Sequence, residues 1–423
     1  MIQRDDYVQK LKHSMWDNNI KIITGIRRCG KSTLLFNLFL NHLHSKGVND
    51  KNIIKIRLDE DNYFKYRNPI LLSKYLKTLI NDTEKYYVFI DEIQMCVSKT
   101  DRYSGIKISV FDVLNGLNNK RNVDIYVTGS NSKMLSKDIL TEFRGRTTQI
   151  RVYPLSFKEY FTYLGGDLDN RLNEFLVFGG MPDLVNKKNE IDKKSYLIDL
   201  FSKTYIKDIV ERKRITREDV LEDILNFLSS QTSSLISINN IVNRLSTIRH
   251  EKLTFEMISK YIHYACDAFL ISESKRYDIK GKTYFDYPSK FYFEDIGLRN
   301  ALLNFRQLDT GHLMENLIYN DLIRRGYLVD VGAIPIREAD NKEYLEIDFI
   351  INNLDKRTYI QSALKIDTVG KLDTETRSLN LTNDNFKKVI IRNDIVTSFL
   401  DAKGILNCSL KDFLLEKVEI WFI

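Results

Sequence analysis

The chain has 423 residues, with 64 Lys and Arg against 57 Asp and Glu and a formal net charge of +7. Its hydrophobic fraction of 43% and charged fraction of 29% are ordinary for a packed globular protein and exclude a disordered or fibrous chain. At roughly 150 residues per domain, this length indicates two to four domains. The sequence has no long apolar run, no apolar signal region at the N-terminus and no paired cysteine spacing. We therefore expect a cytoplasmic protein without a membrane span, a disulfide framework or a structural zinc module.

The first 150 residues alternate short β-rich runs with helical stretches. Strands are predicted over residues 21–24, 52–58, 86–90, 123–128 and 149–152. Strands that alternate with helices are typical of βαβ units on a parallel sheet. The sequence therefore predicts an α/β fold for this part of the chain.

A glycine-rich segment follows the first predicted strand and precedes an apolar-periodic helix. It reads Gly25, Ile26, Arg27, Arg28, Cys29, Gly30, Lys31, Ser32 and Thr33, which fits the pattern GxxxxGK[ST]. In such a loop, successive N–H groups and the helix N-terminus cradle phosphates. We expect Lys31 to reach the β- and γ-phosphates of ATP, and Ser32 to bind Mg²⁺ through its hydroxyl.

Two adjacent carboxylates end the apolar strand at residues 86–90. Asp91 is predicted to hold the Mg²⁺ shell, and Glu92 to act as the general base that polarises the attacking water. Solvent-exposed strand ends often carry acidic residues too, so this pair alone would not define a site. Together with the phosphate-binding loop, it predicts a nucleotide site.

Two further features are consistent with hydrolysis. Ser130 or Asn131, after the strand at 123–128, could orient the attacking water, or could belong to an ordinary turn. Arg146 could act as an arginine finger on the nucleotide of a neighbouring subunit in a homo-oligomer, or could lie in a solvated basic turn. The sequence leaves both alternatives open.

Beyond Pro154 the pattern becomes mainly helical, with a break at residues 178–182. Three more helical patterns occupy residues 217–268. A hairpin with arms at 269–274 and 283–287 is predicted after them. A helix over 312–325 then leads into strands at 345–351, 359–363 and 388–391.

Six segments resemble, in this order, a family of bacterial and archaeal AAA+ ATPases of the STAND-like branch. They are GIRRCGKST, YYVFIDEIQ, VTGSNSKML, FRGR, YPLSFKEY and FGGMPDLV. The resemblance implies an ATPase core (1–154), a helical lid (155–215), a winged helix (216–305) and a degenerate PD-(D/E)XK nuclease-like domain (306–423). It also implies a sensor role for Ser130 or Asn131 and a lid position near the nucleotide for Gly180 and Pro182.

The last two modules suggest DNA as a partner without establishing it. Basic residues on the expected wing could contact DNA, although winged helices also serve as protein docking modules. They are Lys275, Arg276, Lys280 and Lys282.

In the nuclease-like domain, Glu315, Glu346 and Asp348 are candidate acids. Gln361 and Ala363 stand where the second acid and the lysine belong. Lys365 could partly substitute for that lysine, but the departures favour a structural or DNA-holding domain over a nuclease.

The charge is distributed unevenly among these segments. Residues 1–150 hold 25 Lys and Arg against 16 Asp and Glu, whereas residues 301–423 hold 16 against 19. The positive excess therefore lies in the module expected to bind the ATP polyanion. We predict a Mg²⁺-dependent ATPase. The alternatives are a nucleotide-gated switch with little turnover and a metal-dependent DNA nuclease.

Overall fold

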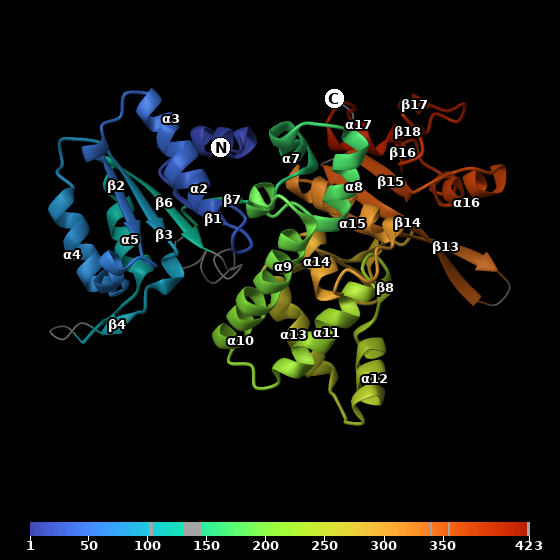
Figure 1. The fold of residues 1–423 in the computed structure, drawn as a ribbon, viewed down its shortest axis with the longest axis horizontal. Helices are drawn as coiled ribbons and strands as arrows, with labels where there is room; N and C mark the ends of the chain where they lie inside the picture. The colour runs from blue at the N-terminus through green and yellow to red at the C-terminus, as the bar shows by residue number, and fades with distance from the viewer. Residues whose placement is uncertain (101–104, 130–144, 339–340, 354–355, 421–423) are drawn as a thin grey trace. The chain divides into compact units, whose positions relative to one another are not determined.

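The computed structural model describes residues 1–100, 105–129, 145–338, 341–353 and 356–420. They form two compact units, shown in Figure 1. The first unit comprises residues 1–154 with 267–269, and the second comprises 155–266 with 270–423.

The first unit is built on a five-stranded parallel sheet with the order β2-β3-β6-β1-β7 (Figure 1). Its strands are β1 (Ile20–Thr24), β2 (Ile53–Arg57), β3 (Tyr86–Asp91), β6 (Val123–Gly129) and β7 (Thr147–Arg151). Its helices are α1 (Asp5–His13), α2 (Lys31–Thr33), the π-helical η1 (Leu34–Phe39), α3 (Leu40–Ser45), α4 (Pro69–Leu79) and α5 (Val110–Asn118). The short elements are η2 (Asp50–Asn52), η3 (Asp61–Arg67), η4 (Ile93–Met95), β4 (Lys99–Thr100) and β5 (Lys107–Ile108). The five predicted strands therefore match the five sheet strands to within one or two residues.

Both faces of this sheet are apolar, because helices cover both. Ile22, Ile90 and Ile125 pack in one core with Leu72 of α4 and Leu114 of α5. On the other face, Phe39 of η1 lies 5.9 Å from Phe89 and 4.9 Å from Tyr126, measured between ring centroids. Strands buried on both faces are expected in a parallel sheet.

The strand order determines which loops meet. Strand β6 lies between β1 and β3, so the carboxyl ends of these three parallel strands lie side by side at one edge of the sheet. Ligands of open α/β sheets bind at this edge.

The second unit begins with helices. They are α7 (Phe157–Leu164), α8 (Leu168–Phe178), η6 (Pro182–Asn186), α9 (Glu190–Leu200), the π-helical η7 (Phe201–Ile206), α10 (Lys207–Lys213), α11 (Glu218–Ser230), α12 (Ile238–Arg249) and α13 (Phe255–Asp267). Helix α7 begins with a capping box, in which the Ser156 hydroxyl accepts the Glu159 N–H and the Glu159 carboxylate accepts the Ser156 N–H. The helical pattern read from the sequence is therefore confirmed over this segment.

The second unit also contains a three-stranded antiparallel sheet, and here the predicted hairpin is wrong. Strand β9 (Ile271–Ser274) pairs with β12 (Ser289–Phe293), which also pairs with β8 (Leu235–Ile236). The turn predicted at residues 280–282 instead joins β10 (Arg276–Asp278) to β11 (Thr283–Tyr284). Burial explains the difference, since every residue of β12 is buried whereas Thr283 and Tyr284 are exposed.

The C-terminal part of the second unit is an eight-stranded mixed sheet with the order β11-β10-β13-β14-β15-β16-β18-β17. Its remaining elements are α14 (Ile296–Leu302), α15 (Thr310–Arg324), β13 (Leu328–Glu338), β14 (Asn341–Asn353), β15 (Lys356–Ala363), α16 (Val369–Asn380), β16 (Lys387–Arg392), β17 (Phe399–Leu400), β18 (Leu406–Ser409) and α17 (Leu410–Leu414). The sequence did not predict β13, the long partner of β14.

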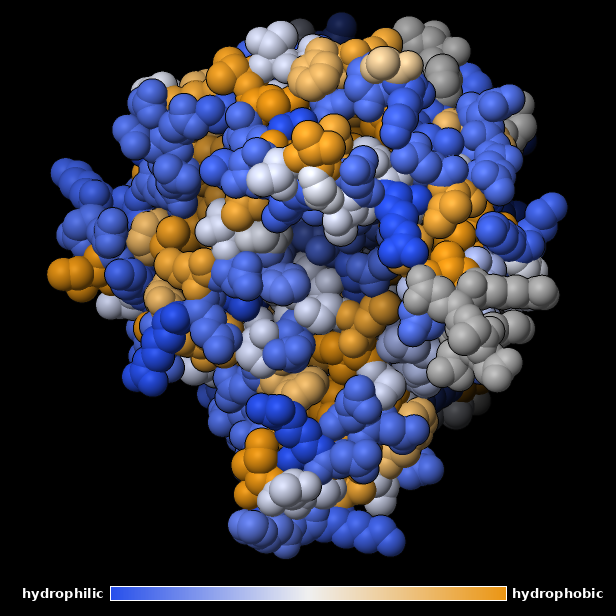
Figure 2. All heavy atoms as spheres, turned by 90° about the vertical axis from the view of Figure 1, so that its right-hand side faces the viewer, coloured by the Kyte–Doolittle hydropathy of each residue, from blue (hydrophilic) through white to orange (hydrophobic). Residues whose placement is uncertain are grey.

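The exposed surface is mixed in character. Hydrophilic residues cover most of the face in Figure 2, with hydrophobic residues in separate groups between them. Among the described residues, no helix combines the length and the apolarity needed to cross a membrane.

Candidate functional site

The phosphate-binding loop lies between β1 and the helix that starts at Lys31, as the sequence predicts. The Lys31 side chain is 4% exposed, and its ammonium donates to the Gly25 carbonyl at 3.0 Å and to the Ile26 carbonyl at 2.9 Å. Gly25 has φ +146°, and a Cβ atom at this position would lie 2.0 Å from the Val152 carbonyl oxygen. Because the loop turns so tightly against this segment, only glycine fits there.

A buried arginine that the sequence analysis missed supports this loop. The Arg4 guanidinium donates to the Cys29 carbonyl at 2.9 Å, to the Tyr153 carbonyl at 2.9 Å and to the Pro154 carbonyl at 3.4 Å. The Cys29 thiol also donates to the Val152 carbonyl at 3.3 Å, and its side chain is fully buried. Cys29 therefore fills space behind the loop, while Arg4 ties the loop to the segment after β7.

The two predicted acids lie at the carboxyl end of β3, and Thr128 at the end of β6 joins them. The Thr128 hydroxyl donates to Asp91 Oδ1 and accepts the backbone N–H of Glu92 at 3.1 Å. Glu92 has φ +53°, a left-handed conformation that costs free energy in a residue other than glycine. Gln94 donates its side-chain amide to the Glu92 carboxylate. Thr128 was not predicted, although its place at the end of the strand next to β3 would have pointed to it.

The structure describes the predicted arginine finger but not the two predicted sensor residues. Ser130 and Asn131 lie outside the described residues. Arg146 is exposed, donates to the Asn119 side chain at 3.1 Å, and immediately precedes β7. In the parallel pairing of β7 with β1, this is the amino edge of the sheet, about 16 Å from the carboxyl edge at ~3.3 Å per residue. Arg146 therefore does not reach the phosphate-binding loop of its own chain.

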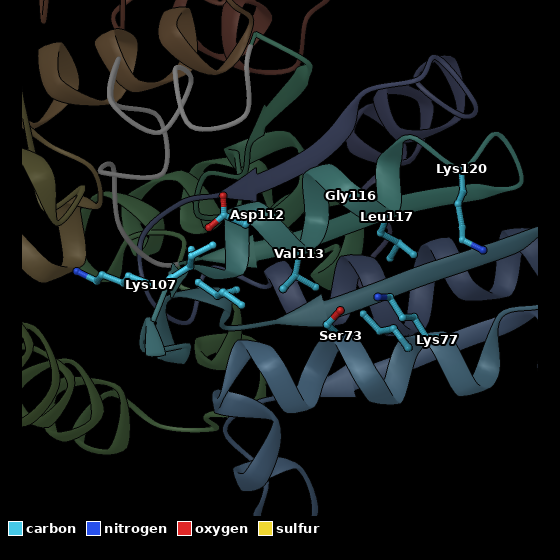
Figure 3. A pocket seen from close by; sticks show the side chains of 11 residues that line it. Ser73, Lys77, Lys107, Asp112, Val113, Gly116, Leu117 and Lys120 are labelled. Atoms are coloured by element: carbon cyan, nitrogen blue, oxygen red, sulfur yellow. The ribbon is translucent and has the colours of Figure 1, made fainter. Parts of the chain in front are cut away.

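Figure 3 shows a pocket of the first unit between α4 and α5. Apolar residues such as Leu76 and Leu117 line it together with Lys77, Lys107 and Lys120. Among the described residues, its lining includes no member of the phosphate-binding loop. The candidate nucleotide site is therefore the loop and not this pocket.

In the second unit, the Gly179-Gly180 break contacts the start of α14. The buried Asp295 carboxylate accepts the N–H groups of Gly180 at 2.7 Å and Leu298 at 3.1 Å. Burial raises the pKa of Asp295 to about 6, against the opposing effect of these N–H groups. The predicted place of Gly180 and Pro182 near the nucleotide stays a prediction.

The acids expected in the nuclease-like domain meet around a lysine that the sequence analysis missed. The ammonium of Lys290, on β12, lies 2.8 Å from Glu315, 2.7 Å from Glu346 and 3.3 Å from Asp348. Burial raises the pKa of the Glu315 carboxyl to about 8, although Lys290 opposes the shift. The signal in the sequence was a single lysine directly before the aromatic run Phe291–Phe293.

Gln361 and Ala363 stand where the nuclease resemblance would place the second acid and the lysine. Gln361 accepts the Asp348 N–H at 3.3 Å through its side-chain oxygen. The structure does not favour Lys365 as a partial substitute for the missing lysine. Its side chain is 65% exposed and pairs with Asp367 at 3.2 Å. Within the described residues, no group of three or more metal-binding side chains is placed to hold a metal ion.

The four basic residues expected on the wing do not form one surface. Lys275, Lys280 and Lys282 are exposed, but Arg276 is half-buried and its guanidinium lies over the rings of Phe285 (5.1 Å) and Tyr344 (4.8 Å). Strand β10 also belongs to the eight-stranded sheet. These contacts give little support to DNA binding at this hairpin.

The parallel sheet with a phosphate-binding loop after β1 and paired acids after β3 defines an AAA-type P-loop nucleotide-binding domain. Comparison with known families agrees, since residues 17–161 match the family described as "AAA domain". Residues 169–309 match a domain of unknown function, DUF8612.

The chain is 31% identical to an uncharacterized protein of Haemophilus influenzae over 397 residues, which cover 92% of this chain and 93% of the relative. It therefore belongs to the same family as this relative, and in this chain the AAA domain precedes the DUF8612 domain. An uncharacterized protein of Methanocaldococcus jannaschii is 29% identical, covering 88% of this chain and 85% of its own.

Solved structures show only a distant likeness. The structure of Cdc6p from Pyrobaculum aerophilum has 12% sequence identity and a TM-score of 0.30, covering 74% of this chain and 95% of its own. The structure of Orc1 from Aeropyrum pernix in complex with DNA has 13% identity and a TM-score of 0.26, covering 71% of this chain and 92% of its own. At these TM-scores the likeness assigns no function.

Proposed function

We propose that the chain is a Mg²⁺-dependent AAA+ ATPase that converts its nucleotide state into a conformational change of the second unit. The observation that carries this proposal is the meeting of three strand ends at one edge of the sheet. The phosphate-binding loop follows β1, Thr128 is the penultimate residue of β6, and Asp91 ends β3. This arrangement brings an anion cradle and two carboxylates together.

Each residue has a chemical role in this proposal. Lys31 exchanges the carbonyls of Gly25 and Ile26 for the β- and γ-phosphates when ATP enters. Glu92, held by the Thr128 hydroxyl and Gln94, accepts the proton of the attacking water.

The site has the donor chemistry for Mg²⁺. Ser32 offers a hydroxyl beside the loop, and the buried Asp91 offers a carboxylate; both are hard oxygen ligands of the kind that Mg²⁺ prefers. When bound with the nucleotide, Mg²⁺ would neutralise phosphate charge during hydrolysis.

The route from the nucleotide to the second unit runs through residues 152–154. Gly25 and Cys29 contact Val152, and Arg4 bonds both to Cys29 and to Tyr153 and Pro154. A movement of the loop on nucleotide binding would therefore reach the segment that leads out of the first unit.

In this proposal the second unit contains a helical lid (155–215), a winged helix (216–305) and a nuclease-like domain (306–423). Arg146 is suited to act on the nucleotide of a neighbouring copy, since it lies at the opposite edge of its own sheet. DNA remains a candidate partner of the second unit.

Phosphate release by the purified chain and by Lys31→Ala tests the proposal. We expect ATP turnover in the unmodified protein and its loss, together with weaker ATP binding, in Lys31→Ala. Lys46→Ala, at an exposed lysine of the same unit, is the matched control and should behave like the unmodified protein. Unchanged turnover in Lys31→Ala would refute the proposal.

The alternative of a nucleotide-gated switch predicts negligible turnover but a nucleotide-dependent assembly. Sizing chromatography in ATP and in ADP distinguishes the two, because only the switch would change its oligomeric state without releasing phosphate. Turnover measured with and without DNA across a salt series then tests DNA as the partner, since contacts to phosphates weaken as salt rises.

A further inference from the structure

The carboxylate pocket of the C-terminal domain already contains a cation from the protein itself. Lys290 has a side chain that is only 2% exposed, and its ammonium lies within 3.3 Å of Glu315, Glu346 and Asp348. An ammonium has three N–H donors, and here three carboxylates from α15 and β14 surround it.

The neighbouring side chains hold the carboxylates in place around this ammonium. Tyr292, two residues further along the same face of β12, donates to Glu315 at 2.8 Å and stacks on Tyr319 at 3.9 Å between ring centroids. The second oxygen of Asp348 accepts the Ser362 N–H at 2.8 Å.

The backbone of Lys290 is equally constrained. Strand β12 pairs at this residue with Leu235 of β8 on one side and with Ser274 of β9 on the other. The ammonium could leave the pocket only if its buried stem also left, because the strand itself is fixed between two neighbours.

The resemblance to PD-(D/E)XK nucleases implies a divalent metal among these acids, and the residues present do not fit one. A metal would have to share its ligands with a positive charge that contacts all three carboxylates. We infer that the Lys290 ammonium is the resident cation of this pocket, replacing a metal and fastening β12 to α15 and β14. The C-terminal domain is then a rigid arm of the second unit and not a metal-dependent nuclease.

Titration of the nucleotide-free protein with Mn²⁺, followed by the electron paramagnetic resonance signal of free Mn²⁺, tests this inference. The unmodified protein and Asp348→Asn should bind Mn²⁺ alike, because the acids around Lys290 hold no Mn²⁺ in either. In Lys290→Ala, which leaves the carboxylates without their cation, we expect one additional Mn²⁺ to bind, with a Kd at least about ten-fold below that of any Mn²⁺ binding by the unmodified protein. Its thermal unfolding midpoint should fall and partly recover on addition of Mn²⁺.

Lys365→Ala is the matched control, because Lys365 is exposed and pairs only locally with Asp367 among the contacts described. It should behave like the unmodified protein in both measurements. A Mn²⁺ site in the unmodified protein that Asp348→Asn abolishes would overturn the inference. A folded Lys290→Ala without a new Mn²⁺ site would overturn it too. If Lys290→Ala does not fold, the comparison of the unmodified protein with Asp348→Asn decides alone.

Discussion

Thr128 offers a specific test of how the two acids are held. Thr128→Val keeps the shape of the side chain but removes the hydroxyl that donates to Asp91 and accepts the Glu92 N–H. A hydrogen bond to a charged group contributes about 1.5–3 kcal/mol to stability, and one between neutral groups contributes about 1 kcal/mol. Both partners are at a buried strand end, so we expect the free energy of unfolding to fall by about 2–4 kcal/mol.

The same loss should slow hydrolysis more than it weakens binding. Glu92 has a left-handed backbone conformation, and its N–H would lose the acceptor that favours it. If about 2–3 kcal/mol of this positioning is needed in the transition state, kcat should fall roughly 30- to 150-fold. The phosphate-binding loop is untouched, so the Kd for ATP should change by less than about three-fold.

Steady-state phosphate release, equilibrium ATP binding and urea unfolding measure these three quantities. Thr128→Ser retains the hydroxyl and is the matched control, which should restore most of kcat. A folded Thr128→Val with unchanged kcat would refute the assigned roles of Thr128 and Glu92. An equal loss of kcat in Thr128→Ser would show that the methyl group matters and the hydroxyl does not.

Three further predictions follow from buried polar groups. Arg4→Met leaves the Cys29 and Tyr153 carbonyls without their donor, so the free energy of unfolding in urea titrations should fall by about 3 kcal/mol and ATP should bind more weakly. Unchanged ATP binding in Arg4→Met would refute the role of Arg4 at the phosphate-binding loop. Asp124→Ala removes a carboxylate that lies 2.5 Å from the fully buried Lys21 ammonium, so it should destabilise the protein by about 3 kcal/mol in the same assay. A fall in the free energy of unfolding of less than about 1 kcal/mol would show that the ion pair of Lys21 with Asp17 is enough to stabilise the buried ammonium. Asp295 has a pKa raised to about 6, so the folded state retains its proton at a pH where the unfolded state releases it. The free energy of unfolding should then fall by about 2 kcal/mol as pH rises from about 4 to 6, a slope that Asp295→Asn should abolish.

The sequence by itself determined the nucleotide-binding module. Its loop pattern, the alternation of strands with helices and the acids after an apolar strand are local features, and each is written in consecutive residues. Gly25, Lys31 and Asp91 accordingly lie where their local pattern places them. The spacing of apolar residues along the sequence also indicated the helices of the second unit.

Only the tertiary structure decided which distant residues meet. Arg4, Thr128 and Lys290 each form hydrogen bonds with partners at least 25 residues away, and no spacing in the sequence predicts such a contact. The predicted hairpin was wrong because the all-buried strand β12, and not the nearer exposed segment, offers β9 a partner that buries apolar area. Lys365 was considered as a partial substitute because it is close in sequence to Ala363, but the ammonium that meets the acids comes from Lys290 on β12. A buried charge is stabilised by whichever opposite charge the fold brings within reach, and that is a property of packing rather than of order along the chain.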